Sequence, residues 1–82
     1  MESVLLRINN TQIWLIYEGL VFYEGRKLKD SNAFLCYFNF SLPINLPYGD
    51  LLLDENDTPR VFIDKNEVEK FAVSYLKKRF EL

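Results

Sequence analysis

Side chains able to do covalent or acid–base chemistry are few in this chain of 82 residues. It contains no histidine, so Ser-His-Asp and Cys-His catalytic arrangements and His-based metal sites are absent. The single thiol, Cys36, lies within an apolar run, where a cysteine usually packs and stays inert. The three glycines are isolated from one another, so there is no glycine-rich phosphate-binding loop. We therefore predict a non-enzymatic protein without a cofactor; an enzyme would have to rely on carboxylates, tyrosine or lysine.

An acidic segment is the one place that suggests a metal site. Between residues 50 and 69 there are seven acidic residues and two basic ones. When Asp54 is aligned with the start of an EF-hand loop, Pro59 falls where glycine is needed. Lys65 then falls where the bidentate glutamate belongs. Because this match fails, we interpret residues 54–59 as a solvated turn and predict no metal site.

Tyrosines and basic residues are arranged in a way that suggests nucleic-acid binding. In modules that bind single strands, aromatic side chains stack on bases and cations neutralise phosphates. Tyr17, Tyr23 and Tyr37 are candidates for the stacking platform. The candidate phosphate contacts are Arg26, Lys27, Lys29, Lys77 and Lys78. The net charge is −2 and an RNP signature is missing, so binding of single-stranded RNA is the alternative function and not the leading one.

Residues 33–42 form the most informative predicted strand, because both of its faces are apolar. Alternation puts every second residue on the same face. One face carries Phe34, Cys36, Phe38, Phe40 and Leu42, and the other carries Ala33, Leu35 and Tyr37. A sheet that contains this strand needs cover on both sides.

The N-terminal half predicts further strands. Residues 4–8 alternate between apolar and polar, and residues 13–17 are apolar on both faces. Glu18-Gly19 is predicted to form a tight hairpin turn into a strand at 20–23, because glycine accepts positive φ. The polar residues 25–32 are predicted to be a loop.

The C-terminal half predicts one helix. Residues 51–53 and 60–63 are short predicted strands on either side of the acidic turn. The helix spans 64–80, with Asp64 as N-cap and Glu67 completing a capping box. Its apolar spacing includes Val68, Phe71, Ala72, Tyr75 and Leu76.

These elements predict a single compact α+β domain over residues 1–82. It is an antiparallel β-meander of four to six strands with one C-terminal α-helix packed on one face. We expect the helix to cover Phe34, Phe38 and Phe40. The opposite face must then be covered by segment 43–59 or by another molecule.

That second face predicts a small binding protein that acts through protein–protein contacts, with its own copy or with a different protein. An inhibitor, an antitoxin or an immunity-type factor would act in this way. Aromatic residues dominate interface hot spots. The predicted contact residues are Trp14, Tyr17, Tyr23, Leu35 and Tyr37.

The sequence also predicts where the protein works. It has one cysteine, no signal-peptide pattern and no window of roughly 20 apolar residues, so we expect a cytoplasmic protein that does not enter a membrane. Residues of AT-rich codons (Phe, Tyr, Met, Ile, Asn and Lys) number 31 of 82, which suggests an AT-rich bacterial or viral genome. A short accessory protein from a phage or another mobile element would fit this bias.

Overall fold

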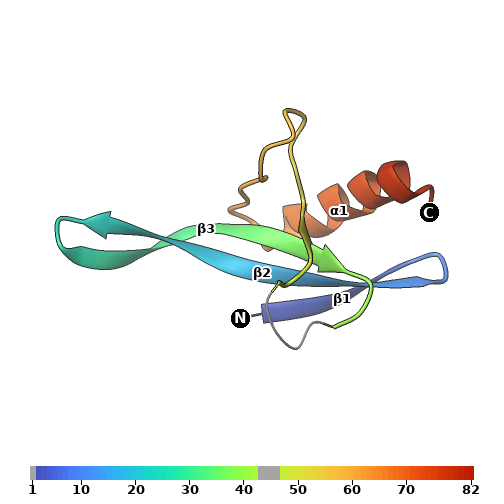
Figure 1. The fold of residues 1–82 in the computed structure, drawn as a ribbon, viewed down its shortest axis with the longest axis horizontal. Helices are drawn as coiled ribbons and strands as arrows, with labels where there is room; N and C mark the ends of the chain where they lie inside the picture. Colours follow the sequence, from blue (N-terminus) through green and yellow to red (C-terminus); the bar gives the residue numbers. More distant parts are fainter. Residues whose placement is uncertain (1, 43–46) are drawn as a thin grey trace.

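A computed structural model describes residues 2–42 and 47–82 as a four-stranded antiparallel sheet with one C-terminal helix (Figure 1). The elements are β1 (Glu2–Ile8), β2 (Thr11–Glu24), β3 (Lys27–Asn39), β4 (Asp50–Leu51) and α1 (Lys65–Phe80). The strands lie side by side in chain order. The predicted α+β meander with a C-terminal helix is therefore confirmed.

The turn between β2 and β3 lies later in the chain than the sequence predicts. β2 runs without interruption through Glu18-Gly19, and Gly19 pairs with Phe34 inside the sheet. The turn forms at Gly25-Arg26 instead, where Gly25 has φ 64°. The predicted hairpin at Glu18-Gly19 and the predicted loop at 25–32 are both wrong. One long strand continues the alternation that begins at residue 13 and keeps Glu18 and Gly19 paired with β3 within the sheet.

β2 and β3 extend past the rest of the sheet as a two-stranded arm, residues 20–32 (Figure 1). β1 pairs with β2 only as far as Tyr17, and residues 21–30 are all exposed. A bulge marks the base of the arm: Leu20 alone lies opposite three residues of β3. Ser31 Oγ donates a hydrogen bond to the Leu20 carbonyl at 2.6 Å and holds the bulge. The arm therefore projects from the body along the longest axis of the molecule.

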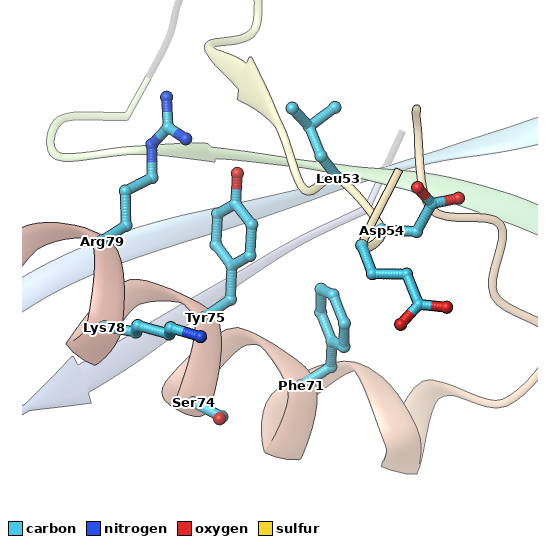
Figure 2. Close-up of a pocket in the computed structure, with 8 residues that line it drawn as sticks. Leu53, Asp54, Phe71, Ser74, Tyr75, Lys78 and Arg79 are labelled. Atoms are coloured by element: carbon cyan, nitrogen blue, oxygen red, sulfur yellow. The ribbon is translucent and has the colours of Figure 1, made fainter. Parts of the chain in front are cut away.

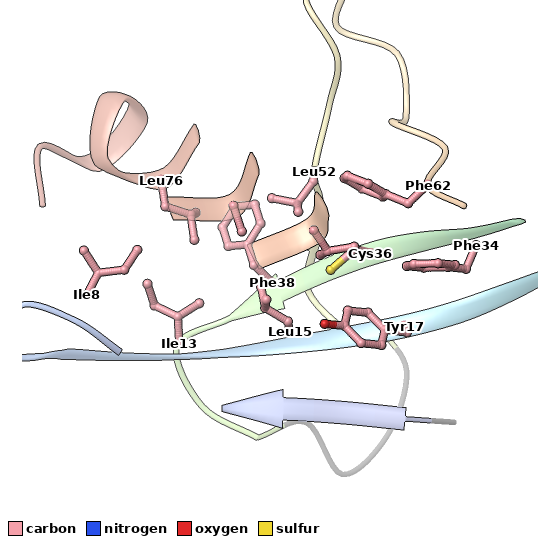
Figure 3. Packing of buried hydrophobic residues seen from close by; sticks show 12 residues of the cluster. Ile8, Ile13, Leu15, Tyr17, Phe34, Cys36, Phe38, Leu52, Phe62 and Leu76 are labelled. Atoms are coloured by element: carbon pink, nitrogen blue, oxygen red, sulfur yellow. The ribbon is translucent and has the colours of Figure 1, made fainter. Parts of the chain in front are cut away.

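The core lies between the sheet and α1 and collects side chains from one face of β1, β2 and β3 and from the segment that follows β4 (Figure 3). Its buried members are Ile8, Ile13, Leu15, Tyr17, Phe34, Cys36, Phe38, Leu52, Phe62, Val68, Ala72 and Leu76. Phe34, Cys36 and Phe38 of the predicted face thus pack under the helix. Phe40 and Leu42 do not: they lie past the end of β3 at Asn39 and are 48% and 51% exposed. The predicted stop of the strand, Pro43, lies outside the described residues.

Phe34 reaches the helix through a residue that the sequence places on a separate strand. The Phe34 and Phe62 rings stack with centroids 5.9 Å apart, and Phe62 meets Phe71 of α1 edge-on at 5.5 Å. The backbone of Phe62 exchanges two 2.9 Å hydrogen bonds with Phe34. The predicted 60–63 strand is therefore reduced to a single bridge, which pins the segment between β4 and α1 onto β3.

Asp64 caps the helix as predicted. Its backbone is extended, with φ −133°, and its side chain accepts a hydrogen bond from the backbone N–H of Asn66 at 2.9 Å. We expect Asp64→Ala to lower the free energy of unfolding by about 1 kcal/mol, because an N–H of the first turn loses its acceptor. Urea unfolding measures this difference. Lys70→Ala, an exposed mid-helix change, is the control, and equal losses in the two variants would contradict the capping role.

Candidate functional site

The five predicted contact residues lie in three different places. Trp14, Leu35 and Tyr37 are half-buried on the sheet face opposite α1, which we call the outer face. Tyr17 has the opposite parity and is only 7% exposed, packed in the core against Phe34. Its prediction as a surface contact is therefore wrong. Tyr23 lies on the arm, 75% exposed.

The outer face is partly covered by the chain itself. The Tyr48 ring packs edge-on against Tyr37 with centroids 5.5 Å apart, and Asn39 Nδ2 donates to the Tyr48 carbonyl at 3.4 Å. Ile16, also on this face, is buried. Of segment 43–59, residues 43–46 lie outside the described residues and residues 50–53 lie alongside β3, so Tyr48 supplies the cover that is seen. The apolar surface that stays free on the outer face is therefore smaller than the apolar sequence of residues 33–42 suggests.

The arm carries exposed apolar side chains on both of its faces: Phe22, 50% exposed, lies on one face and three others lie on the opposite face. Val21, Tyr23 and Leu28 are 52%, 75% and 58% exposed. Tyr23 pairs with Leu28, and Val21 shares their face by alternation, so the three side chains form what we call the apolar face of the arm. In β2 this face continues the row that supplies Leu15 and Tyr17 to the core. The positions of β2 that face the core thus continue into the arm, where α1 does not cover them and their side chains are exposed to solvent.

The basic residues do not form one surface. Arg26 lies at the tip of the arm, with Lys27 and Lys29 beside it on β3. Lys77 and Lys78 lie in the last turns of α1, at the other end of the molecule (Figure 1). The predicted tyrosine platform is also divided, because only Tyr23 shares the arm with a basic group.

A groove lies between α1 and the turn that follows β4, with a volume of about 440 Å³ (Figure 2). Leu53, Phe71 and Tyr75 give it an apolar lining, with Asp54 at the Phe71 end. Glu55 also lies at that end, beside Asp54 and Phe71. The opposite end carries Lys78 and Arg79, and the Arg79 guanidinium lies 5.8 Å from the centroid of the Tyr75 ring. The Arg60 guanidinium also lies at the Phe71 end, 5.0 Å from the centroid of the Phe71 ring, so that end carries charges of both signs. Sequence reasoning missed the groove because it depends on how the turn packs against the helix.

The side chain of Asp54 stabilises the turn that follows β4 through three hydrogen bonds. Asp54 Oδ1 accepts hydrogen bonds from the backbone N–H groups of Asn56 and Thr58 at 2.9 and 3.1 Å, and Thr58 Oγ1 donates to Asp54 Oδ2 at 2.6 Å. These bonds lower the pKa of the Asp54 carboxyl. Glu55 has no such structural task, so it is the better position for changing the charge of the groove.

Cys36 is fully buried beneath α1, and burial raises the pKa of its thiol from 9.0 to about 12. In the unfolded chain the thiol ionises above about pH 9, whereas the native thiol keeps its proton. The contribution of this difference to stability is therefore complete below pH 9 and is lost as the pH rises toward 12. We expect the free energy of unfolding to fall by about 2 kcal/mol between pH 8 and 10.5.

Urea unfolding at the two pH values measures this fall. Burial also raises the pKa of Tyr17 to about 12, so Cys36→Ala should show a smaller fall with the same sign. A native thiol that titrates near pH 9, followed by thiolate absorbance, would contradict the prediction.

Other kinds of site find no support among residues 2–42 and 47–82. No three His, Cys, Asp or Glu side chains there lie close enough together to hold a metal ion. The helix in that part of the chain is not long and apolar enough to cross a membrane. Comparison with protein-family models, curated proteins and solved structures finds no match. The arm and the groove are thus the features from which a function can be argued.

Proposed function

We propose that this chain is a small non-enzymatic binding protein that engages a protein partner through its arm. One observation carries the proposal: Val21, Tyr23 and Leu28 stand more than half exposed on one face of a hairpin that adds nothing to the core. A two-stranded hairpin is marginal in water without further packing. Contiguous exposed apolar side chains mark interaction sites, and an exposed tyrosine is a typical hot-spot residue.

The outer face supplements the arm in this proposal. Trp14 and Leu35 are half-buried, and Leu5 of β1 is 41% exposed on the same face. A partner that binds the arm would also contact these residues of the outer face. An inhibitor, antitoxin or immunity-type role needs only such contacts and no reactive side chain, which fits a chain without histidine whose one thiol is buried.

Co-purification from cells that express the tagged chain tests this function. The arm variant replaces Val21, Tyr23 and Leu28 with threonine, which keeps strand propensity and removes apolar area. Ile63→Thr is the control, because Ile63 is exposed but lies off the arm. We expect the recovered protein to be lost with the arm variant and retained with the control. Equal recovery with both would contradict the proposal.

Binding of single-stranded RNA is the alternative, and one observation favours it: the arm carries exposed Tyr23 together with three basic residues, Arg26 at the tip and Lys27 and Lys29 on the face opposite Tyr23. Three phosphate contacts predict that log K falls with log salt with a slope of about −2. Combined Arg26→Ala and Lys27→Ala substitutions should then reduce both the affinity and the slope. Purified protein that binds RNA with this signature would replace the proposed function with the alternative.

A further inference from the structure

We propose that the chain forms a two-fold dimer in which β1 pairs antiparallel with β1 of a second copy, with Leu6 opposite its own counterpart and α1 beside its counterpart. This inference goes beyond the proposed function, because it uses β1 and α1 and no residue of the arm. The two sheets would join into one sheet of eight strands, four from each copy.

β1 is an edge strand with one open side. In the described part of the chain, β2 is the only strand that pairs with it. β1 is seven residues long, contains no proline and pairs with β2 without a bulge, so it lacks features that commonly keep an edge strand from pairing with another molecule. Its outward backbone N–H and C=O groups can therefore accept a further strand.

The register with β2 shows which backbone groups point outward. Ile8 and Thr11 pair across a two-residue turn, so the N–H and C=O groups of Ile8 point to β2. By alternation, the N–H and C=O groups of Leu5 and Arg7 point to the open side. In an antiparallel pair centred on Leu6, Leu5 of each copy lies opposite Arg7 of the other. These two residues can therefore exchange backbone hydrogen bonds on both sides of the centre.

A second groove, of about 550 Å³, lies between β1 and α1. Leu6 of β1 and Val73 of α1 give it an apolar lining, and both are half-buried and pack against the core. Glu69 and Lys77 also line it, about one helical turn before and after Val73. The core is thus open to solvent along this groove, and a strand added to β1 would cover it.

α1 runs in the same direction as β1, and the two elements share a centre (Figure 1). Lys65 forms a salt bridge with Glu2 near the start of both elements, and Val73 shares the groove with Leu6. Four residue steps from Glu2 to Leu6 span about 13 Å in a strand, and eight steps from Lys65 to Val73 span about 12 Å in a helix. A two-fold axis through Leu6 therefore passes close to Val73.

This axis makes the charges on α1 complementary to those on its copy. An antiparallel strand pair has its two-fold axis perpendicular to the sheet, so the two helices lie antiparallel on the same side. Glu69 and Lys77 are each four residues from Val73, so Glu69 of each copy faces Lys77 of the other. Both side chains are exposed, and neither forms a salt bridge with another described residue. Backbone groups, apolar residues and charges thus match under one symmetry operation, which favours a second copy over an unrelated strand.

Light scattering on the purified chain over a range of concentrations tests this proposal, and charge reversal locates the contact. We expect a concentration-dependent dimer. Glu69→Lys alone and Lys77→Glu alone should each weaken dimerisation about ten-fold, because the symmetry turns two attractive contacts into two repulsive ones. Lys78→Glu makes the same charge change as Lys77→Glu on the other flank of α1, and it should leave the dimer unchanged.

Mixing the two weakened variants gives the sharpest result. The Glu69→Lys chain is basic at both positions and the Lys77→Glu chain is acidic at both, so every charged contact between unlike chains is attractive. An equimolar mixture should therefore regain the affinity that each variant loses alone. Rescue of this kind excludes misfolding as the cause of the weakening.

A proline at position 5 tests the strand pairing itself. Because the N–H of Leu5 points to the open side, Leu5→Pro removes a donor from the dimer contact and none from the pairing of β1 with β2. We expect Leu5→Pro to be a monomer at concentrations where Leu5→Thr, which keeps the N–H, is a dimer. Circular dichroism should show the same fold for both variants.

A monomer at up to about 1 mM would overturn the inference. So would a dimer that Leu5→Pro leaves intact, or a mixture that dimerises as weakly as its components. The arm variant should remain a dimer, and its loss of the dimer would also contradict the inference. Loss of a protein partner from the arm variant in cells tests the proposed function alone, so the two proposals can fail separately.

Discussion

Phe62→Ala is expected to lower the free energy of unfolding by about 3–5 kcal/mol. Phe62 is 1% exposed and links the ring of Phe34 on β3 to that of Phe71 on α1. The Arg60 guanidinium also lies 5.5 Å from its centroid. Truncation would leave a cavity where the sheet, the helix and the segment between them meet. Because small domains are stable by only about 5–15 kcal/mol, we expect a large fall in the urea midpoint.

Ile63→Ala is the matched control for this experiment. The side chain is the immediate neighbour of Phe62 and of similar hydrophobicity, but it is 75% exposed. Its truncation should change the free energy of unfolding by no more than about 0.5 kcal/mol. Similar losses at the two positions would mean that residue 62 does not fasten the segment to the sheet.

The arm variant, in which Val21, Tyr23 and Leu28 are all threonine, is expected to lose association at least about 100-fold. Its free energy of unfolding should stay within about 0.5 kcal/mol of the native value, because these side chains pack on no core residue. A protein that keeps its stability and loses its partner separates binding from folding. Urea unfolding measures the stability, and co-purification from cells measures the loss of the partner.

A matched control replaces three other exposed apolar residues with threonine: Leu42, Val61 and Ile63. They are 51%, 53% and 75% exposed, close to the values on the arm, but none belongs to it. We expect this control to associate like the native chain. If both variants lost association equally, general surface hydrophobicity would explain the effect and the arm would have no special role.

The helix and the buried face of β3 could be predicted because their signals are local. Asp64 offers a capping carboxylate, and Val68, Ala72 and Leu76 recur at helical spacing. Phe34, Cys36 and Phe38 alternate within one strand. Each pattern needs only a few neighbouring residues to be recognised.

The position of the β2–β3 turn could not be predicted in the same way. Glu18-Gly19 and Glu24-Gly25 offer the same turn chemistry, so the local sequence does not choose between them. The choice is made by pairing across the sheet, where Tyr17 must lie opposite Cys36. That register depends on the packing of the whole core, which a local pattern does not contain.

The arm could not be predicted for the same reason, because the exposure of its side chains depends on residues far away in the sequence. Tyr17 and Tyr23 lie on one face of one strand and both precede Glu-Gly. They differ because Tyr17 is covered by the body, whereas Tyr23 lies past its edge. In residues 25–32, Leu28 is the one large apolar residue, so this half of the arm resembles a loop. The part of β3 in the arm can be recognised as a strand only when it is paired with β2.

Photo-cross-linking from position 23 tests most directly whether the arm touches a partner protein. A benzophenone side chain at Tyr23 is irradiated in the full chain, in cells and after purification, and the products are identified by mass. Position 12 is the control, because Gln12 is exposed at the opposite end of β2. We predict protein adducts from position 23 and none of these from position 12. No protein adduct from position 23, or the same adducts from both positions, would contradict the role of the arm.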